Sequence, residues 1–142
     1  MSPTRCELCY PTGEDVLFAN DRYRVIAVGG EEGKCYRGFS RVVWNEHVRE
    51  MSDLSVEARD TLMYAIYRVE AALRLSLNPD KINLASLGNM TPHLHWHVIP
   101  RFQHDPTFPK PIWVATNVYP VVTLDDDDGW KAAVRAAFQP VN

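Results

Sequence analysis

Three histidines occupy alternate positions in the stretch HLHWH, at His93, His95 and His97. In an extended strand, successive side chains point to opposite faces, so the three imidazoles would share one face while Leu94 and Trp96 share the other. Two kinds of chemistry suit such a row. Alternate strand positions can both reach one zinc ion that keeps an open coordination position. Alternatively, a neutral imidazole can attack phosphorus while a neighbouring group protonates the leaving group.

A Cys-x-x-Cys pair, Cys6 and Cys9, lies near the start of the chain. Two thiolates supply half of a tetrahedral zinc site, and His47 and His93 are the candidates for the two nitrogen ligands. Such a closed site would be structural and would leave the other two histidines of HLHWH free for chemistry. A redox dithiol is the competing interpretation, but it is typical of a βαβ context that this sequence lacks. The third cysteine, Cys35, is expected to be a free thiol.

Turn residues and alternating patterns indicate where the first strands lie. A hairpin is expected within 15–28, around Asn20 and Asp21, and a flexible loop follows at 29–34. Strand character returns within 36–44, which is rich in aromatic and β-branched residues. The first third of the chain is therefore expected to be extended.

A change of hydrophobic period after Ser55 predicts one long helix that ends near Asn78. Its apolar face is expected to consist of Leu62, Ile66, Val69, Leu73 and Leu77. Strand character returns at 81–87, and the histidine stretch is expected to form a further strand up to Pro100. The helix would then cover the apolar face of the strand that carries the histidines.

The acidic run Asp125 to Asp128 is interpreted as a turn before a short C-terminal helix, because carboxylates favour a helix N-terminus. A calcium site is the alternative, but the ligand spacing of a calcium loop is absent. The strands, helix and strands follow one another without regular βαβ alternation, which favours an α+β fold with an antiparallel sheet. The 142 residues suit a single domain, 1–142.

Composition narrows the classes of partner. Hydrophobic residues at 46% and charged residues at 23% are close to the average for globular proteins. A net charge of −3 without a basic patch gives no reason to expect a nucleic-acid partner. No apolar run is long enough to span a bilayer, and the N-terminus has no apolar signal region, so no membrane association and a cytoplasmic location are expected.

The motif HLHWHVIPRF resembles the signature of the histidine triad (HIT) superfamily, in which three histidines alternate with apolar residues. The likeness extends over most of the chain. It includes the Cys-x-x-Cys pair, WNEHV around His47, the long helix, INLASLGN before the triad, and Pro100-Arg101 after it.

The resemblance implies a HIT-like fold, a homodimer, and a nucleotide hydrolase or transferase acting on nucleoside monophosphate derivatives. Dinucleoside polyphosphates such as diadenosine tetraphosphate are the preferred substrate class, and aminoacyl or amine adenylates come next. His95 would attack the α-phosphorus and form a covalent nucleotidyl-imidazole, while His97 would contact the phosphate and help protonate the leaving group. In the uridylyltransferase branch the third position is glutamine, so His97 favours hydrolysis. That branch also binds zinc through the pattern met here as two cysteines, His47 and His93.

Three further residues are candidates for substrate binding by the same resemblance. Asn89 stands where the family usually has glutamine, Asn83 resembles an asparagine that contacts ribose or phosphate, and Arg101 is a candidate for a place near the phosphates. Ordinary turn or strand asparagines and a solvated arginine are the alternatives. The sequence also departs from the family at Phe39, where many members have histidine, and at Gly29, where a ribose-binding aspartate is usual.

Some functional alternatives stay open at this point. Trp113 would either close the nucleotide pocket or cap the core. A nucleotide-binding sensor with little turnover would keep the pocket without using His95 as a nucleophile. A metallohydrolase would instead bind zinc at the three histidines of the triad.

Overall fold

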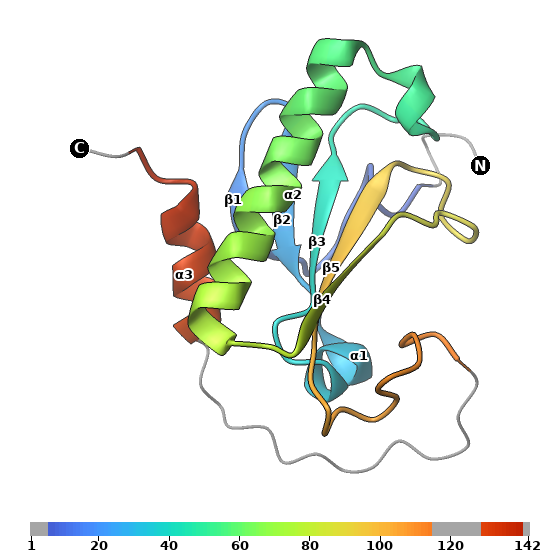
Figure 1. The fold of residues 1–142 in the computed structure, drawn as a ribbon. Coiled ribbons are helices and arrows are strands. Elements are labelled where there is room, and N and C mark those ends of the chain that lie inside the picture. Colours follow the sequence, from blue (N-terminus) through green and yellow to red (C-terminus); the bar gives the residue numbers. More distant parts are fainter. Residues whose placement is uncertain (1–5, 115–128, 141–142) are drawn as a thin grey trace.

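Five strands form one antiparallel sheet with the spatial order β1-β2-β3-β5-β4 (Figure 1). The structure is a computed structural model that describes residues 6–114 and 129–140. The strands are β1 (Asp15–Ala19), β2 (Tyr23–Ala27), β3 (Ser40–Trp44), β4 (Lys81–Ala85) and β5 (His95–Arg101). The helices are α1 (Gly30–Cys35), the short 3-10 helix η2 (Met51–Asp53), α2 (Val56–Leu77) and α3 (Gly129–Ala137). The expected α+β fold with an antiparallel sheet is confirmed.

The long helix α2 covers one face of the sheet and forms the main core with it (Figure 1). Ser55 caps its N-terminus by accepting a hydrogen bond from the backbone N–H of Ala58, and Asn78 ends it in the left-handed conformation. The expected apolar helix face is confirmed, since Leu62, Ile66, Val69 and Leu73 are buried and Leu77 packs against the same core.

The hairpin expected around Asn20 and Asp21 is confirmed by the antiparallel pairing of β1 with β2. The side-chain oxygen of Asn20 accepts hydrogen bonds from the backbone N–H groups of Arg22 and Tyr23, which closes the turn. Alternate residues of β2 face the core with α2, so the face that carries the other residues is free for polar side chains.

A second, smaller apolar cluster lies on a different part of the sheet and contains Cys35, Tyr36, Phe39, Ile99 and Ile112. The helix α1 supplies the first of these residues. The sequence prediction of a flexible loop at 29–34 is therefore wrong. Burial of Cys35 and Tyr36 at the helix end outweighs the low helix propensity of the glycines, because tertiary packing overrides local preference.

Strand β5 begins at His95, two residues later than expected for the histidine stretch. His93 precedes the strand, and its backbone N–H donates to the carbonyl of Thr91 instead of continuing the ladder. Helix α3 packs against α2 and β1, where Phe138 stacks on Phe18 at 4.7 Å between ring centroids. The short C-terminal helix is confirmed, while the acidic run at 125–128 lies outside the described residues.

Gly38 combines a positive φ with close neighbours, so a side chain there would meet both backbone strain and a clash. Its φ is +84°, and an added Cβ would lie 2.6 Å from Cδ1 of Leu77 and 2.8 Å from Cγ of Pro100. We expect Gly38→Ala to reduce the free energy of unfolding by about 2–4 kcal/mol, combining backbone strain with overpacking. Gly13→Ala is the matched control, because its φ is +69° with nothing within 4 Å of the added Cβ. Denaturant unfolding that gave equal losses for both variants would contradict the close approach at Gly38.

Candidate functional site

Four predicted metal ligands converge from three separate parts of the chain. The potential ligand atoms of Cys6, Cys9, His47 and His93 all lie within 4.8 Å of one another. Nδ1 of His93 is 3.4 Å from the Sγ atoms of both cysteines and 3.2 Å from Nδ1 of His47. Sγ of Cys9 is 3.3 Å from Nδ1 of His47. The N-terminal arm, the segment after β3 and the segment before β5 therefore meet at one point.

The donor set fits a tetrahedral metal ion. In a zinc site with two sulfur and two nitrogen ligands, neighbouring ligand atoms are separated by roughly 3.3–3.8 Å, which follows from the usual bond lengths. Nε2 of His93 lies 2.5 Å from the carbonyl oxygen of Trp44, and a carbonyl can only accept. Nδ1 of His93 must therefore hold a lone pair that faces the two sulfur atoms. Such a backbone bond to the second ring nitrogen is the usual way of orienting a histidine ligand.

His95 presents one ring nitrogen as a free base. Its Nδ1 lies 2.6 Å from the carbonyl oxygen of His93, so Nδ1 carries the proton and Nε2 holds the lone pair. The hydroxyl of Ser86 donates to the backbone carbonyl of His95 at 2.7 Å and fixes the strand at this point. Burial lowers the pKa of His95, and the nearby charge of Arg41 lowers it further, although the bond to His93 opposes both. The ring is therefore neutral and oriented, with a lone pair on Nε2.

His97 lies beside His95, with 5.0 Å between the ring centroids. Its cross-strand partner is Arg41 of β3, whose Nε donates to Nδ1 of His97 at 3.2 Å. The neutral ring of His97 therefore carries its proton on Nε2. Burial, with further contributions from His95 and Arg41, lowers the pKa of His97 to about 3. Next to the nucleophile, the site thus offers a hydrogen-bond donor and a guanidinium.

Two aromatic rings flank His97. Phe39 occupies the position where the resemblance leads us to expect histidine, and its ring lies edge-on at 5.7 Å between centroids. Trp113 lies at 4.9 Å on a loop that follows β5 and is 42% exposed. Trp113 thus contacts the site while part of its ring stays open to solvent, which favours a role at the pocket over a role in the core.

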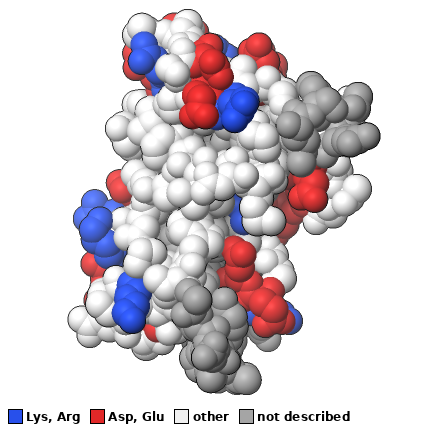
Figure 2. All heavy atoms as spheres, turned by 90° about the vertical axis from the view of Figure 1, so that its right-hand side faces the viewer, with Lys and Arg blue, Asp and Glu red and all other residues white. Residues whose placement is uncertain are grey.

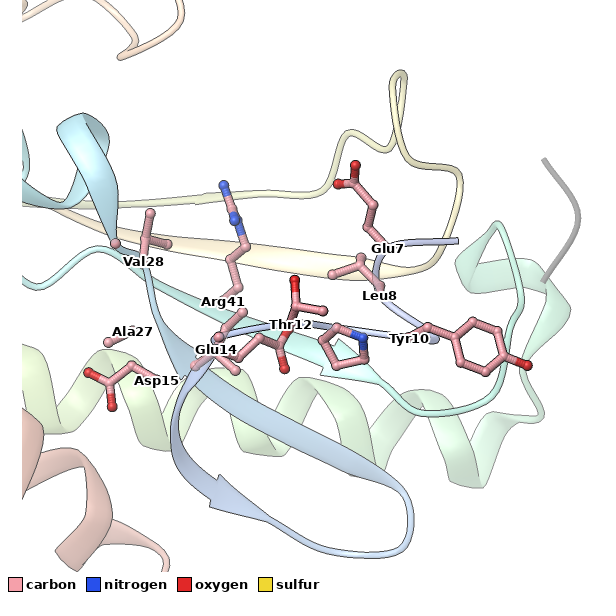
Figure 3. A pocket seen from close by; sticks show the side chains of 13 residues that line it. Glu7, Leu8, Tyr10, Thr12, Glu14, Asp15, Ala27, Val28 and Arg41 are labelled. Atoms are coloured by element: carbon pink, nitrogen blue, oxygen red, sulfur yellow. The ribbon is translucent and has the colours of Figure 1, made fainter. Parts of the chain in front are cut away.

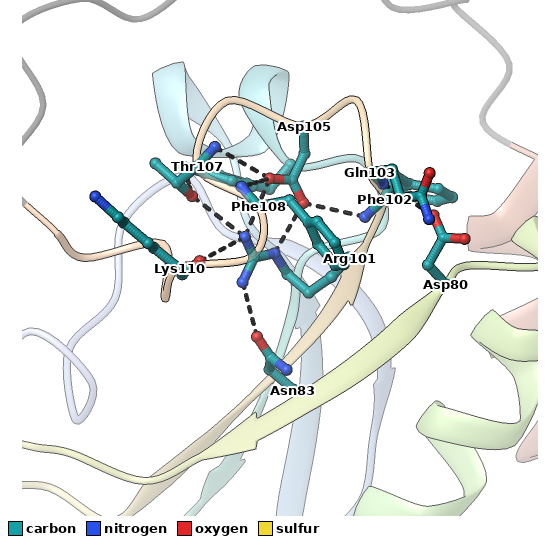
Figure 4. A network of polar contacts seen from close by, with 10 residues as sticks. Asp80, Asn83, Arg101, Phe102, Gln103, Asp105, Thr107, Phe108 and Lys110 are labelled. Carbon is teal, nitrogen blue, oxygen red and sulfur yellow. Dashed lines mark hydrogen bonds and ion pairs between the residues drawn. The ribbon is translucent and has the colours of Figure 1, made fainter.

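Arg101 and Asn83 belong to a buried polar network at the other end of β5 (Figure 4). The Arg101 side chain is only 2% exposed and forms a two-pronged ion pair with Asp105. Its remaining contacts are with the side chain of Asn83, the hydroxyl of Thr107 and the carbonyl of Lys110. The guanidinium is thus directed at protein acceptors, and the substrate-binding roles expected for Arg101 and Asn83 stay predictions.

The same network anchors the loop that leads to Trp113. Burial alone would raise the pKa of the Asp105 carboxyl, but the hydrogen bonds that it accepts outweigh burial, and its pKa lies below the ordinary value. These bonds come from Arg101 and from the backbone N–H groups of Phe102, Thr107 and Phe108. An ionised carboxylate that accepts several backbone bonds is a firm loop anchor.

Asn89 lies exposed on the segment between β4 and β5 that precedes the histidines. Its predicted contact with substrate stays a prediction. Gly88 before it has a φ of +78°, a backbone conformation that glycine adopts without strain.

A hollow of about 490 Å³ lies next to Arg41, between the N-terminal arm and the ends of β1 and β2 (Figure 3). Gly29, which stands where the resemblance leads us to expect a ribose-binding aspartate, lines this hollow together with Val28. Carboxylates are supplied instead by Glu14, which pairs with Arg24 at 2.8 Å, and by other residues of the arm and β1. The hollow is large enough for a nucleoside, and Arg41, which lines it, also donates a hydrogen bond to His97.

The surface shown in Figure 2 carries a broad uncharged band across its middle, with Lys and Arg scattered rather than gathered in one basic patch. No helix in the described ranges is long and apolar enough to cross a membrane.

Sequence reasoning missed Arg41, Ser86 and Asp105. The signal for Arg41 was present: a basic residue in the middle of SRVVW must point away from the core face of the strand. What the sequence alone does not give is the register that pairs Arg41 with His97. Ser86 bonds to a backbone carbonyl, and Asp105 accepts bonds from Arg101 and from backbone N–H groups. Neither residue lies in a distinctive motif.

The HIT domain model matches residues 14–104, and the chain belongs to this family. No curated protein matches. Among solved structures, a histidine triad protein from Bradyrhizobium japonicum is 27% identical, with a TM-score of 0.70, covering 88% of this chain and 92% of its own. One from Marinobacter aquaeolei VT8 is 27% identical with a TM-score of 0.66, covering 89% and 87%. A Zn-bound histidine triad family protein from Mycobacterium smegmatis is 19% identical, with a TM-score of 0.65 and coverage of 96% and 94%, and shares the fold.

The low pKa of His97 predicts a specific loss of stability in acid. The folded state holds this imidazole neutral down to about pH 3, whereas the unfolded chain takes up the proton near pH 6.5. Stability should therefore fall as the pH drops from 6.5 toward 3, with a His97 contribution approaching about 1.4 kcal/mol per pH unit. Denaturant unfolding at several pH values should show a shallower slope for His97→Gln. The exposed His104→Gln serves as control, and equal slopes in all three proteins would contradict the prediction.

Proposed function

We propose that this protein is a nucleotidyl hydrolase that cleaves a nucleoside monophosphate from a dinucleoside polyphosphate or an adenylate conjugate. The observation that carries the proposal is the His95 ring. Its Nδ1–H is held by the carbonyl of His93, so the Nε2 lone pair is free for attack on phosphorus. His97 stands beside it with a hydrogen-bond donor. Membership of the HIT family supports the same reaction class.

The reaction proceeds in two steps in this proposal. His95 attacks the α-phosphorus, the bond to the leaving group breaks, and a nucleotidyl-imidazole forms. Water then attacks phosphorus and releases the nucleoside monophosphate. A covalent intermediate divides one difficult displacement into two easier ones. Hydrogen-bond donors must meet the charge on the phosphoryl oxygens, and the Nε2–H of His97 and the guanidinium of Arg41 are placed for that role.

The hollow next to Arg41 is the proposed nucleoside site, because Arg41 lines it and bonds to His97. The absence of an aspartate at Gly29 suggests that the ribose is bound differently from the usual family pattern. Asn89 remains a proposed substrate contact. Arg101 and Asn83 remain proposed substrate contacts, and Arg101 also holds the loop that brings Trp113 to His97 through its bonds to Asp105, Thr107 and Lys110.

Zinc is the proposed metal, held by Cys6, Cys9, His47 and His93. Two thiolates and two imidazoles are a common donor set for structural zinc. The Zn-bound histidine triad family protein from Mycobacterium smegmatis supports the choice. With all four positions filled by protein, the ion would tie the N-terminal arm to the segment that carries the nucleophile, without taking part in the reaction.

The proposal also includes a homodimer and a single domain spanning 1–142. It further includes a cytoplasmic location without nucleic-acid or membrane partners. The homodimer rests on family resemblance, and the other parts rest on length, composition and charge. The sensor hypothesis keeps the same nucleotide pocket but expects little turnover of the bound nucleotide. The hypothesis of zinc at the triad has less support, because Nδ1 of His93 faces the cysteines while Nδ1 of His95 is occupied by a backbone bond.

Replacing the proposed nucleophile His95 should abolish turnover while the protein stays folded. We expect His95→Asn to lower kcat by about 10⁴-fold or more, as loss of a covalent nucleophile does elsewhere. Rapid mixing with an adenylate followed by denaturing mass spectrometry should show an adduct of one nucleoside monophosphate on the wild type and on His104→Asn. The same experiment should show no adduct on His95→Asn. Tight nucleotide binding without adduct or product in the wild type would favour the sensor hypothesis.

Substitution of a proposed metal ligand should remove bound zinc, whereas substitution of His95 should not. We expect one zinc per chain in the wild type and in His95→Asn, and none in Cys9→Ala. Loss of bound zinc should cost about 4 kcal/mol of stability when free zinc exceeds its dissociation constant a thousandfold. Cys35→Ala is the matched control, because this cysteine lies outside the four-ligand cluster. Loss of zinc from His95→Asn, measured by elemental analysis, would instead support zinc binding at the triad.

A further inference from the structure

The N-terminal arm, residues 6–14, forms one wall of the hollow next to Arg41 (Figure 3). This wall extends from Glu7 to Glu14, and the rest of the lining comes from the start of β1, the end of β2 and Arg41. In the described structure, no residue of the arm belongs to a strand or a helix, so no ladder of backbone hydrogen bonds joins it to the sheet. The shape of the hollow therefore depends on the side-chain contacts that hold the arm in place.

One of these contacts comes from Arg24, in the middle of β2. Its guanidinium forms a two-pronged ion pair with Glu14, at 2.8 Å and 2.9 Å, and donates another hydrogen bond at 2.8 Å to the backbone carbonyl of Leu8. The side chains of Arg24 and Glu14 are only 13% and 14% exposed. Leu8 lies in the turn between the two cysteines, so one arginine holds both this turn and the end of the arm.

The metal cluster attaches the arm at its other end. Cys6 and Cys9 belong to the arm, whereas His47 and His93 belong to segments next to β3 and β5. One ion bound by all four ligands would fix the start of the arm to the sheet. Without an ion, the cysteines keep only weak contacts with the imidazoles, and ordering a chain segment costs conformational entropy.

The two attachments lie at either end of the wall that lines the hollow. A ligand in the hollow therefore contacts a segment whose order depends on the metal cluster. When the metal has already ordered the arm, a ligand has less conformational entropy to lose on binding, and its affinity rises. The coupling is reciprocal, because a ligand that holds the arm against the sheet also raises the affinity of the cluster for its metal.

We propose that the arm is a metal-organised wall of the nucleoside site, and that Arg24 is a positioning residue that holds this wall against the sheet. Metal binding at the four-ligand cluster and nucleotide binding in the hollow then strengthen each other. Arg24 is absent from the described residues that line the hollow, so it acts through the arm and not by contact with the ligand. The inference rests on the proposed function, which places the nucleoside in this hollow.

Adenosine monophosphate (AMP) is the probe, because it is the expected product and is not turned over. Calorimetric titration of the full chain gives its affinity with one equivalent of zinc and again after a chelator has removed the zinc. We expect the dissociation constant of AMP to rise about tenfold or more when zinc is removed. By reciprocity, saturating AMP should raise the affinity for zinc by the same factor, measured by competition with a chromophoric chelator.

A second comparison separates the arm from the histidines. Removal of zinc also releases His93, whose carbonyl holds the ring of His95. Arg24→Met leaves all four metal ligands in place but loses the bonds to the arm. With zinc saturating, we expect this variant to bind AMP about fivefold or more weakly than the wild type, and its affinity for zinc should also fall.

Arg22→Met is the matched control for this substitution. Arg22 lies two residues before Arg24 in the chain and also forms a two-pronged ion pair, but its partner is Glu57 of α2 and not a residue of the arm. Its replacement should change neither the affinity for AMP nor the affinity for zinc.

Hydrogen exchange measures the order of the arm without any nucleotide. Compared with the zinc-loaded wild type, the amides of 7–14 should exchange about tenfold or more faster in the zinc-free wild type and in zinc-saturated Arg24→Met. The amides of β2 and β3 should keep their protection. Loss of protection throughout β2 and β3 on zinc removal would overturn the inference, because the metal would then hold the whole fold and not the arm.

The binding measurements distinguish failure of the inference from failure of the proposed function. Equal AMP affinity with and without zinc, or equal affinity in zinc-saturated wild type and Arg24→Met, would overturn the inference and leave the proposed function standing. Absence of AMP binding to the zinc-loaded wild type would also overturn the inference. If the nucleotidyl adduct on His95 were absent as well, the proposed function would fail with it.

Discussion

His93 is the residue on which the rest of the site depends, because one residue makes three different connections. Its Nδ1 faces the two cysteines and His47, its Nε2–H is held by the carbonyl of Trp44, and its own carbonyl fixes the tautomer of His95. The candidate metal ligand His93 and the proposed nucleophile His95 are thus two residues apart and share one backbone segment. Any displacement of His93 would disturb the metal cluster and the direction of the His95 lone pair together.

Arg101 and Arg41 lie on the face of the sheet away from α2 and have different surroundings. Arg101 is surrounded by acceptors from its own loop and acts as an anchor. Arg41, by contrast, is partly open to the adjacent hollow, with one donor on His97 and a longer pairing to Glu32. Two arginines on one sheet therefore differ in their surroundings, because Arg101 is enclosed by close acceptors and Arg41 lines a hollow with one longer ion pair to Glu32.

The sequence predicts much of this arrangement, for reasons that can be stated. The periodic spacing of Leu62, Ile66, Val69 and Leu73 indicates the helix because burial on one face imposes that period. The four metal ligands are predictable since their residue types and number match a tetrahedral site. The helix α1 is not predictable from GGEEGK, because its stability comes from packing of Cys35 and Tyr36 beneath distant residues. The pairing of Arg41 with His97 depends on strand register, which no local pattern specifies.

The spacing of the metal ligands has a consequence for how the chain matures. Cys6 and His93 are separated by 87 positions, so the ligand set is incomplete until well over half of the chain has been synthesised. The two thiols leave the ribosome first and wait without their nitrogen partners, while the last ligand arrives only a few residues ahead of the nucleophile. The proposed zinc site can therefore close only after His93 has been made, and Cys6 and Cys9 lack their nitrogen partners until then.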